Sequence, residues 1–400
     1  MSRYQYERLS VQDNDFLVWE TPALPMHGAG TNIFEAGCLR NEHGGIDFEA
    51  IKRLTESVLH LIPRYRQKLV WIPGEDHAVW VDDDHFNLDY HFRHTSLPRP
   101  GTDEQLRLLT ARLMEHPLDR SRPLWETWVV EGLERDRFAT VNKFHHCMID
   151  GASGVNLFQL LLSRTPDRET REVRRFIPRP TPSPRDLRND EWIRKLTTPL
   201  WLGRQLVDFV RESRDGAGDL PRRASSLVGL GRRKLFPVSE TPINGKIGPH
   251  RVIEWTEMPF ADVKAMREAL GCTVNDVVLT VVTGAIRKLM LSRQIEPGKL
   301  EFRVSTPVNV RRARKGETSG NHVSSWIVRL PLGVECPLEQ LKAIRAATVD
   351  LKDSNEASVI KMLVTVASML GMSVQNLSVG TMNTIVTNVP GPAFPLYMLG

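Results

Sequence analysis

Cysteine is scarce in this sequence. Four cysteines occur among 400 residues, Cys38, Cys147, Cys272 and Cys336, and no two of them stand at a paired spacing. This scatter argues against a disulfide framework and against a zinc site, and it is typical of a protein in a reducing cytoplasm. We therefore expect no bound metal.

Long apolar runs are also absent. No stretch of about 18 apolar residues occurs, so the sequence predicts no membrane-spanning helix. Residues 1–30 carry acidic side chains and no apolar central segment, which argues against a signal peptide. Hydrophobic residues make up 41% of the chain and charged residues 25%, as in a globular protein, and 400 residues favour two domains.

Two common catalytic signatures are missing. The chain has no Gly-x-Ser-x-Gly, which marks many serine hydrolases, and no glycine-rich phosphate loop.

The excess of positive charge is small. The formal net charge is +5, with +8 in residues 164–234 and −3 in the remainder. The acids and prolines of that basic segment make a poor phosphate-binding stripe, so we expect no nucleic-acid partner.

The most informative feature present is the run His-His-x-x-x-Asp-Gly at residues 145–151. An alternating, β-rich segment precedes it and a helical pattern follows, which predicts a strand-to-helix corner. A histidine there can take up a proton near neutral pH, because its unperturbed pKa is about 6.5. Asp150, followed by Gly151, can lock the geometry behind His146. Taken alone, the pattern is more often two buried histidines and a capping aspartate.

Further blocks accompany this motif along the chain. They are Leu9–Phe16 with Glu20–His27; Pro123, Leu124 and Trp125 with Glu126 and Glu131–Leu133; Thr273–Val278, which contains Asn275 and Asp276; and Thr387–Pro392, which contains Asn388, Pro390 and Gly391. In this order the blocks resemble those of the bacterial wax ester synthase/acyl-CoA:diacylglycerol acyltransferase family. The histidine motif alone is shared by a wider superfamily of CoA-dependent acyltransferases.

The resemblance implies an α/β (α+β sandwich) fold, with two chloramphenicol-acetyltransferase-like domains, mixed sheets and the active site at their interface. The order of elements agrees, because strands and helices mix without regular βαβ alternation. We expect an N-terminal acyltransferase domain at residues 1–165 and a basic, Pro/Arg-rich linker with an amphipathic helix at 166–245. A C-terminal acyltransferase domain is expected at 246–400, lacking its last elements, because family members continue beyond this point.

Periodicity predicts individual elements as well. Helices are expected at 48–62, 103–116, 262–270, 274–290 and 338–351, with a further helix from 155, and strands at 78–81, 128–130, 138–144, 302–310, 323–330 and 382–389. The apolar residues of the last segment, Phe394 and 396–399, are expected to lack a packing partner and to promote self-association.

The linker carries an apolar stripe with basic residues between its members. The stripe consists of Trp192, Ile193, Leu196, Leu200, Val207 and Val210, and the basic residues are Arg194, Lys195, Arg204 and Arg211. Such a helix can lie in a membrane interface or pack on a neighbouring domain. We expect packing, because Pro199 interrupts the helix.

The resemblance also implies roles for the site residues. His146 is expected to act as general base, His145 to support the motif, and Asp150 to orient the loop through a salt bridge with an arginine. Asn275 either serves the oxyanion and its hydrogen-bond network or caps a helix, and the sequence leaves both open. Cys147 follows His146 and is expected on the opposite face, as a small buried residue rather than a nucleophile.

The Pro-Leu-Trp and Asn-Val-Pro-Gly-Pro blocks contain no acid or base, so Pro123, Leu124, Trp125, Asn388, Pro390 and Gly391 are expected to shape the channel and its turns. Asp276 is expected to be a structural residue of its block. The implied reaction moves a long-chain acyl group from acyl-CoA, a co-substrate, to diacylglycerol or a fatty alcohol, with no permanently bound cofactor. The other expected partner is an anionic membrane or lipid-body surface, with peripheral attachment at the inner membrane.

Two alternatives share part of this evidence. A peptide-condensing domain also carries His-His-x-x-x-Asp-Gly, but it lacks the Pro-Leu-Trp and Thr-Val-Asn-Asp blocks. A non-catalytic protein of lipid droplets or membranes would tolerate a broken motif, whereas every motif residue is present here.

Overall fold

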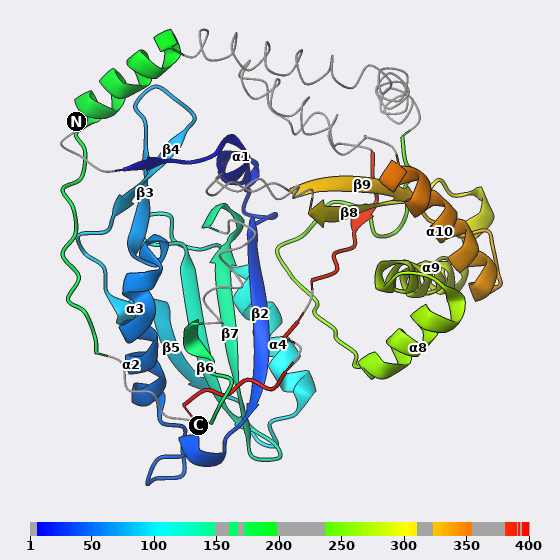
Figure 1. The fold of residues 1–400 in the computed structure, drawn as a ribbon, viewed down its shortest axis with the longest axis horizontal. Coiled ribbons are helices and arrows are strands. Elements are labelled where there is room, and N and C mark those ends of the chain that lie inside the picture. Colours follow the sequence, from blue (N-terminus) through cyan, green and yellow to red (C-terminus); the bar gives the residue numbers. More distant parts are fainter. Residues whose placement is uncertain are drawn as a thin grey trace.

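The computed structural model describes residues 6–148, 160–166, 172–197, 237–309, 323–353, 381–389, 391–392 and 394–399. Within these residues the molecule is a mixed α/β structure with three sheets. Figure 1 shows an N-terminal body of elements beside a smaller body formed by α8, α9, α10, β8 and β9.

The largest sheet is built around a hairpin of two long strands. In spatial order it contains β2 (His27–Glu35), β7 (Arg137–His145), β6 (Trp125–Leu133) and β5 (Phe92–Ser96). β2 and β6 run antiparallel to β7, whereas β5 runs parallel to β6. The register places His27 opposite His145, so the start of β2 lies beside the histidine motif.

Helices cover both faces of this sheet. The N-terminal helices are α1 (Val11–Trp19), α2 (Phe48–Val58), α3 (Leu88–His91) and α4 (Asp103–Glu115). Because side chains alternate along a strand, Val129 joins the core cluster that contains Ile51 of α2, whereas its neighbour Val130 joins the cluster that contains Leu106 of α4. The rigid sheet is therefore packed on both sides, which fixes where β7 ends.

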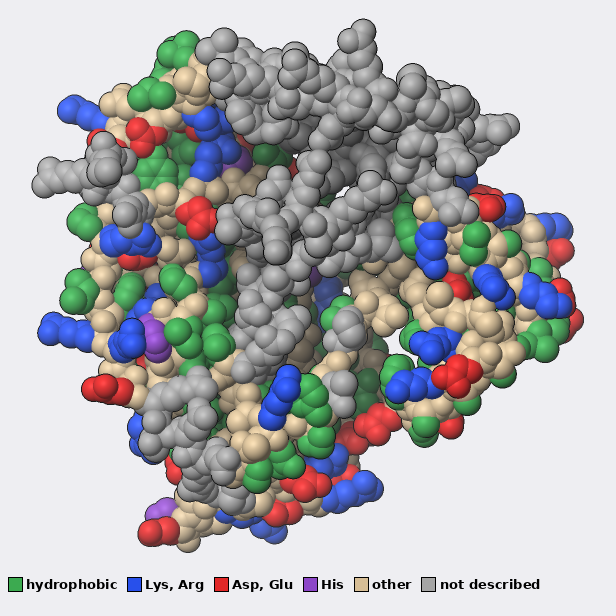
Figure 2. All heavy atoms as spheres, viewed as in Figure 1, with side chains coloured by type: hydrophobic (Ala, Val, Ile, Leu, Met, Phe, Trp, Pro, Cys, Tyr) green, Lys and Arg blue, Asp and Glu red, His purple; other side chains and the backbone are tan. Residues whose placement is uncertain are grey.

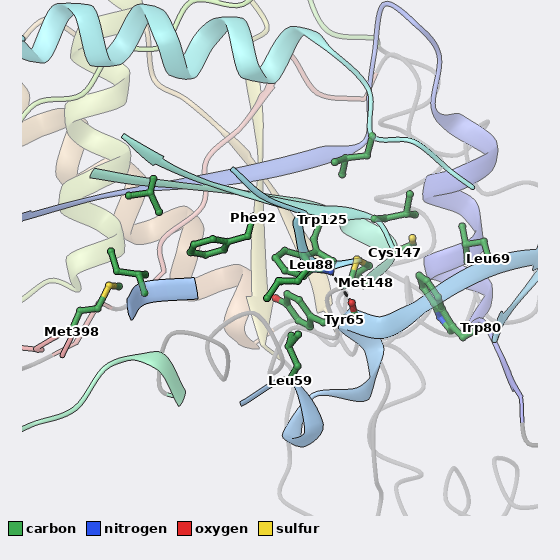
Figure 3. Close-up of a cluster of buried hydrophobic side chains, with 14 of the residues drawn as sticks. Leu59, Tyr65, Leu69, Trp80, Leu88, Phe92, Trp125, Cys147, Met148 and Met398 are labelled. Carbon is green, nitrogen blue, oxygen red and sulfur yellow. Dashed lines mark hydrogen bonds between the residues drawn. The ribbon is translucent and has the colours of Figure 1, made fainter. Parts of the chain in front are cut away.

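A second, smaller sheet completes the N-terminal body. It has the order β1 (Glu7–Arg8), β4 (Ala78–Asp82) and β3 (Gln67–Trp71), and both of its strand pairs are antiparallel. Trp80 of β4 is 2% exposed and belongs to the same core cluster as Trp125 and Cys147. Figure 3 shows these side chains among the residues of that cluster.

The C-terminal body has its own core. Its elements are α8 (Phe260–Leu270), α9 (Val274–Ser292), β8 (Arg303–Asn309), β9 (Val323–Arg329), α10 (Pro337–Asp353) and β10 (Thr384–Ile385). Val304 of β8 and Val328 of β9 pack with Leu279 of α9 and Ile344 of α10. Both long helices therefore cover one face of this sheet, which has the order β10-β8-β9.

Most of the predicted elements in the described residues are confirmed to within a few residues. Helix 48–62 is shorter than predicted, because regular helix ends at Val58 and a 3-10 turn, Leu59–Leu61, precedes Pro63. The predicted strand 382–389 is wrong in length, since β10 spans two residues and pairs with β8 for only that distance. The helix predicted from residue 155 lies largely outside the described residues.

The prediction that the last apolar segment lacks a packing partner is wrong. Tyr397 exchanges two backbone hydrogen bonds of 2.9 Å with Ser163. Met398 is 5% exposed and joins the N-terminal core cluster, and Leu399 packs against the same cluster. The basis for the predicted self-association is therefore removed, although Phe394 stays 40% exposed.

The first part of the linker is anchored to the N-terminal body. Arg179 donates three hydrogen bonds of 2.8–3.0 Å to the buried carboxylate of Asp82 through its backbone N, Nε and Nη2. In the following helix, residues 184–197, Leu187 is 2% exposed and Glu191 pairs with Arg8 at 3.3 Å. The segment thus lies against the small sheet, and its helix, residues 184–197, is called the strap helix below.

The expectation that the apolar stripe of this helix packs on a domain is wrong for its described members. Trp192, Ile193 and Leu196 are 69%, 60% and 68% exposed. The buried face of this helix carries Leu187 and Glu191, which are one helical turn apart. Leu200, Val207 and Val210, the other members of the stripe, lie outside the described residues.

In the part of the chain that the structure describes, no single helix has both the length and the apolar character needed to cross a membrane. α8 and α9 meet these criteria only as a pair, and they are bent by 102° relative to each other.

Candidate functional site

The histidine motif lies at the end of β7. β7 ends at His145, and a 3-10 turn, η4 (His146–Met148), follows it. The backbone of the corner is tied on both sides: His145 N donates to Leu124 O at 3.0 Å, and His146 N donates to Met26 O at 2.9 Å. Asp150 and Gly151 lie outside the described residues, so the arginine partner expected for Asp150 is not identified.

The two histidines have different surroundings. His145 is 1% exposed. Its Nε2 lies 3.5 Å from Oε1 of Glu20, and its Nδ1 accepts a 3.1 Å hydrogen bond from the backbone N of Cys147. His146 is exposed to solvent, and its ring stacks on Phe16 of α1 with the ring centroids 5.3 Å apart. Only His146 is therefore open to a substrate.

The environment keeps His146 neutral. Burial by surrounding groups lowers the pKa of His146 below its ordinary 6.5, and the neighbouring His145 lowers it further. Since the ring still reaches solvent, the neutral imidazole can accept a proton at pH 7. This is the form that a general base requires.

Behind the corner stands an ionised carboxylate that the sequence did not single out. Burial alone raises the pKa of Glu20, but the neighbouring His145, the hydrogen bonds from Arg120 and the bond from Met26 N lower it to about 2. Arg120 donates to Oε2 of Glu20 through Nε at 3.0 Å and Nη2 at 2.6 Å. Glu20 belongs to the opening block, and that membership was the available signal; Arg120 precedes the Pro-Leu-Trp block and carried no such signal.

Cys147 is a buried thiol. It is 3% exposed, and burial raises its pKa well above the ordinary value, with nearby Asp13 acting in the same direction. A protonated and inaccessible thiol is a poor nucleophile. The geometry therefore favours direct transfer over an acyl-cysteine intermediate.

The Pro-Leu-Trp block supports the corner from within the core. Trp125 is 2% exposed, and its Nε1 donates to Tyr65 O at 2.8 Å. Its ring stacks on His91 at 4.8 Å, and Figure 3 shows it beside Tyr65 and Met148. Because Leu124, which is also buried, accepts the bond from His145 N, this block sets the position of the end of β7.

Asp276 belongs to the N-terminal cap of α9, whereas Asn275 does not. The N-cap of α9 is Thr273, whose side chain forms a capping box with Asp276, so Asn275 does not cap the helix. Asp276 accepts from Thr273 N at 2.8 Å and from Thr348 Oγ1 at 2.8 Å, and it is a structural residue. Asn275 is half-buried. Within the described residues, no hydrogen bond joins it to His146.

The described residues of the last block form no hydrogen bond with the corner. Asn388 and Gly391 are exposed, and Pro390 lies outside the described residues. Among the residues that can be described, no group of three or more His, Cys, Asp or Glu side chains is arranged to hold a metal ion.

An open hollow of about 740 Å³ lies at the other end of β6 and β7, near Glu131 and Leu133. Two of its charged side chains are already paired, Arg40 with Asp136 and Glu131 with His94. No histidine is among its described lining residues, so we place the candidate site at His146.

Comparisons with known proteins show matches to one family. The model of the wax ester synthase/diacylglycerol acyltransferase catalytic domain matches residues 9–278, and the model of the family's C-terminal domain matches residues 319–400. A probable diacylglycerol O-acyltransferase of Mycobacterium tuberculosis is 31% identical over 407 residues, which cover 96% of this chain and 84% of the relative.

Solved structures show the fold. The wax ester synthase/diacylglycerol acyltransferase from Marinobacter aquaeolei VT8 matches with a TM-score of 0.64 and 24% identity, over 98% of this chain and 84% of that one. The first condensation domain of the calcium-dependent antibiotic synthetase matches with a TM-score of 0.54 and 14% identity, over 88% and 76%. The predicted mixed α/β fold with two chloramphenicol-acetyltransferase-like domains is thereby confirmed.

The family assignment rests on the sequence matches rather than on the fold. The two family models together cover most of the chain, and the relative from Mycobacterium tuberculosis matches over 96% of this chain. The chain belongs to the wax ester synthase/diacylglycerol acyltransferase family and is an O-acyltransferase.

Proposed function

We propose that this chain transfers a long-chain acyl group from acyl-CoA directly to a lipid hydroxyl, with His146 as the general base. The observation that carries the proposal is the contrast at the corner: His146 is exposed and kept neutral, whereas His145 is buried and held by Glu20. The family to which the chain belongs makes diacylglycerol and long-chain alcohols the acceptors to test first.

In this mechanism His146 removes the hydroxyl proton as the acceptor oxygen attacks the thioester carbonyl. The new C–O bond forms, a tetrahedral oxyanion develops, and the C–S bond then breaks. The CoA thiolate leaves and takes the proton from His146, so the base returns to its neutral form. Asn275 is the candidate to stabilise the oxyanion or its hydrogen-bond network, a contribution on the order of 3 kcal/mol in a water-excluded site. Asp150 holds the loop behind His146.

The experiment that tests the proposal uses the purified chain with palmitoyl-CoA. Each acceptor, a diacylglycerol or a long-chain alcohol, is added in turn, and free CoA is followed with a thiol reagent while the ester is identified by mass spectrometry. Ester formation with at least one acceptor supports the proposal. CoA release without ester identifies a thioesterase, and no turnover with any acceptor supports a non-catalytic lipid-associated protein.

The rate should depend on pH in a defined direction. The neutral imidazole of His146 is the active form, and its pKa is lowered, so kcat/KM should stay constant down to pH values below 6.5 and fall only at lower pH. A rate profile measured between pH 5 and 9 at constant ionic strength checks this. A fall that begins well above pH 6.5 would show that another group is the base.

We further propose that the chain works on the surface of the inner membrane or of lipid bodies, facing the cytoplasm. The strap helix, residues 184–197, supports this, because it is anchored through Leu187 and leaves Trp192, Ile193 and Leu196 in solvent. Figure 2 shows hydrophobic side chains on the surface over this helix, at the upper left. Tryptophan and aliphatic side chains beside basic residues are typical of interfacial helices.

Vesicle binding should depend on these three side chains. The variant Trp192→Ala/Ile193→Ala/Leu196→Ala should co-sediment with anionic vesicles less than the wild type. Binding of the wild type should weaken with salt, since each basic residue near an anionic surface contributes roughly 1 kcal/mol. Leu108→Ala, which removes an apolar side chain that is 54% exposed on α4, is the matched control. If the wild-type chain does not bind anionic vesicles even at low ionic strength, the segment is a linker without a role in membrane binding.

A further inference from the structure

Glu20 is a buried carboxylate that the proposed chemistry does not use. Its side chain is 7% exposed, and it lies directly after α1, far in sequence from the motif. Both of its oxygens are engaged. Oε1 accepts from Met26 N at 3.0 Å and lies 3.5 Å from Nε2 of His145, whereas Oε2 accepts both bonds from Arg120.

These contacts reach the corner by two routes. The first runs through His145, whose Nε2 lies 3.5 Å from Glu20 and whose Nδ1 accepts from the backbone N of Cys147 at 3.1 Å. Through Met26, Glu20 holds the peptide segment whose carbonyl accepts from the backbone N of His146, at 2.9 Å. Together, these contacts hold the backbone from His145 to Cys147 from two sides. This segment presents the His146 side chain.

The hydrogen bond to Nδ1 also fixes the tautomer of His145. Because Nδ1 accepts a hydrogen bond from a backbone N–H, it carries no proton. The proton of the neutral ring is then on Nε2, which lies 3.5 Å from Oε1 of Glu20. A carboxylate is the partner that this arrangement requires, because it only accepts and its pKa of about 2 keeps it ionised at every working pH.

We propose that Glu20 is a positioning residue for acyl transfer: it holds His145 in the Nε2–H tautomer and thereby sets the backbone that aims His146 at the acceptor. This inference rests on the proposed role of His146. Glu20 does not touch the reacting atoms, and it acts through His145 and Met26. Arg120 balances its charge, so the carboxylate can remain buried.

The test is Glu20→Gln, which keeps the shape and removes the charge. An amide offers one acceptor oxygen where the carboxylate offers two, and it places an N–H group against the donors of Arg120 or His145. We expect kcat to fall by about 10- to 100-fold, as for other residues that orient a reacting group from behind. KM for acyl-CoA should stay within about twofold, because no contact with substrate is lost.

Glu191→Gln is the matched control. Glu191 is also buried, at 5% exposed, and it also pairs with two arginines, Arg8 and Arg194, but it lies on the strap helix. Both variants should lower Tm, whereas only Glu20→Gln should lower kcat of the folded fraction. Equal kcat values for the two variants would overturn the proposal.

The route through His145 is tested separately. If Glu20 acts partly through that ring, the effects of Glu20→Gln and His145→Ala on kcat should combine to less than their product, whereas fully multiplicative effects would contradict a shared route. Two-bond ¹H–¹⁵N spectra of histidine-labelled wild-type protein, assigned with the His145→Ala variant, should show His145 as the Nε2–H tautomer. An Nδ1–H tautomer would overturn the proposal without any activity measurement.

These outcomes distinguish the positioning role from the proposed function itself. If His146→Ala keeps full activity, the assignment of the base is wrong. If His146→Ala is inactive while Glu20→Gln has the kcat of the wild type, the base stands and only the positioning role is wrong.

Discussion

His146→Ala is expected to reduce kcat for acyl transfer by roughly 10²- to 10⁴-fold, the range that a positioned general base contributes. The fold should be unaffected, because the side chain is exposed and its recorded ring contact is with Phe16. Steady-state CoA release at saturating acyl-CoA, together with Tm from thermal unfolding, measures both quantities on the same preparation.

Two further variants serve as comparisons for His146→Ala. His85→Ala removes a histidine whose side chain is 88% exposed, away from the corner, and should leave kcat unchanged. His145→Ala should reduce kcat less than His146→Ala but lower Tm more, because it empties a fully buried site, leaves Cys147 N without its acceptor and removes one contact of Glu20. If His145 proves the more sensitive of the two at equal folding, the assignment of the base is reversed.

Trp125→Ala is expected to have the largest effect on stability, about 3–5 kcal/mol in the free energy of unfolding. The indole is 2% exposed and packs between His91 and Tyr65, and its removal leaves both a cavity and an unpaired Tyr65 carbonyl. Since domains have only about 5–15 kcal/mol of stability in total, much of the protein should be unfolded or insoluble at 37 °C. Urea unfolding followed by circular dichroism measures the change.

Trp192→Ala is the control for this substitution. It removes the same side chain from a position that is 69% exposed, where little packing is lost, and it should change the unfolding free energy by less than about 0.5 kcal/mol. A similar loss for both tryptophans would mean that the strap helix packs in solution against a surface that the structure does not place on it.

The sequence predicted the elements whose patterns are local. The corner at residues 145–148, the capped helix α4 and the long apolar helix α9 each follow from periodicity and terminal residues that are close in sequence. β2 was not predicted, because His27–Glu35 contains two glycines and does not alternate clearly between apolar and polar residues. It becomes a strand because nine consecutive residues find register with β7.

Two features of the site could not be read from local patterns. An apolar stripe such as the one at Trp192 looks the same whether it meets a domain, a membrane or water, since burial depends on the partner surface. The contact between Glu20 and His145 depends on β2 pairing with β7, which joins segments separated by more than one hundred residues in the sequence. Family resemblance marked the opening block that contains Glu20, but its physical role appears only in three dimensions.

The return of residues 394–399 to the N-terminal core has a consequence for how the protein is made. Met398 fills a place in the same cluster as Leu9 and Leu17, so one hydrophobic core contains residues that are very far apart in the sequence. A ribosome delivers those parts at very different times. While the middle of the chain is being synthesised, the N-terminal sheet can form but its core is incomplete, with apolar surface open where Met398 and Leu399 later pack. The N-terminal core can therefore be completed only after the segment around Tyr397 has left the exit tunnel, and chaperone binding to the nascent chain should persist until then.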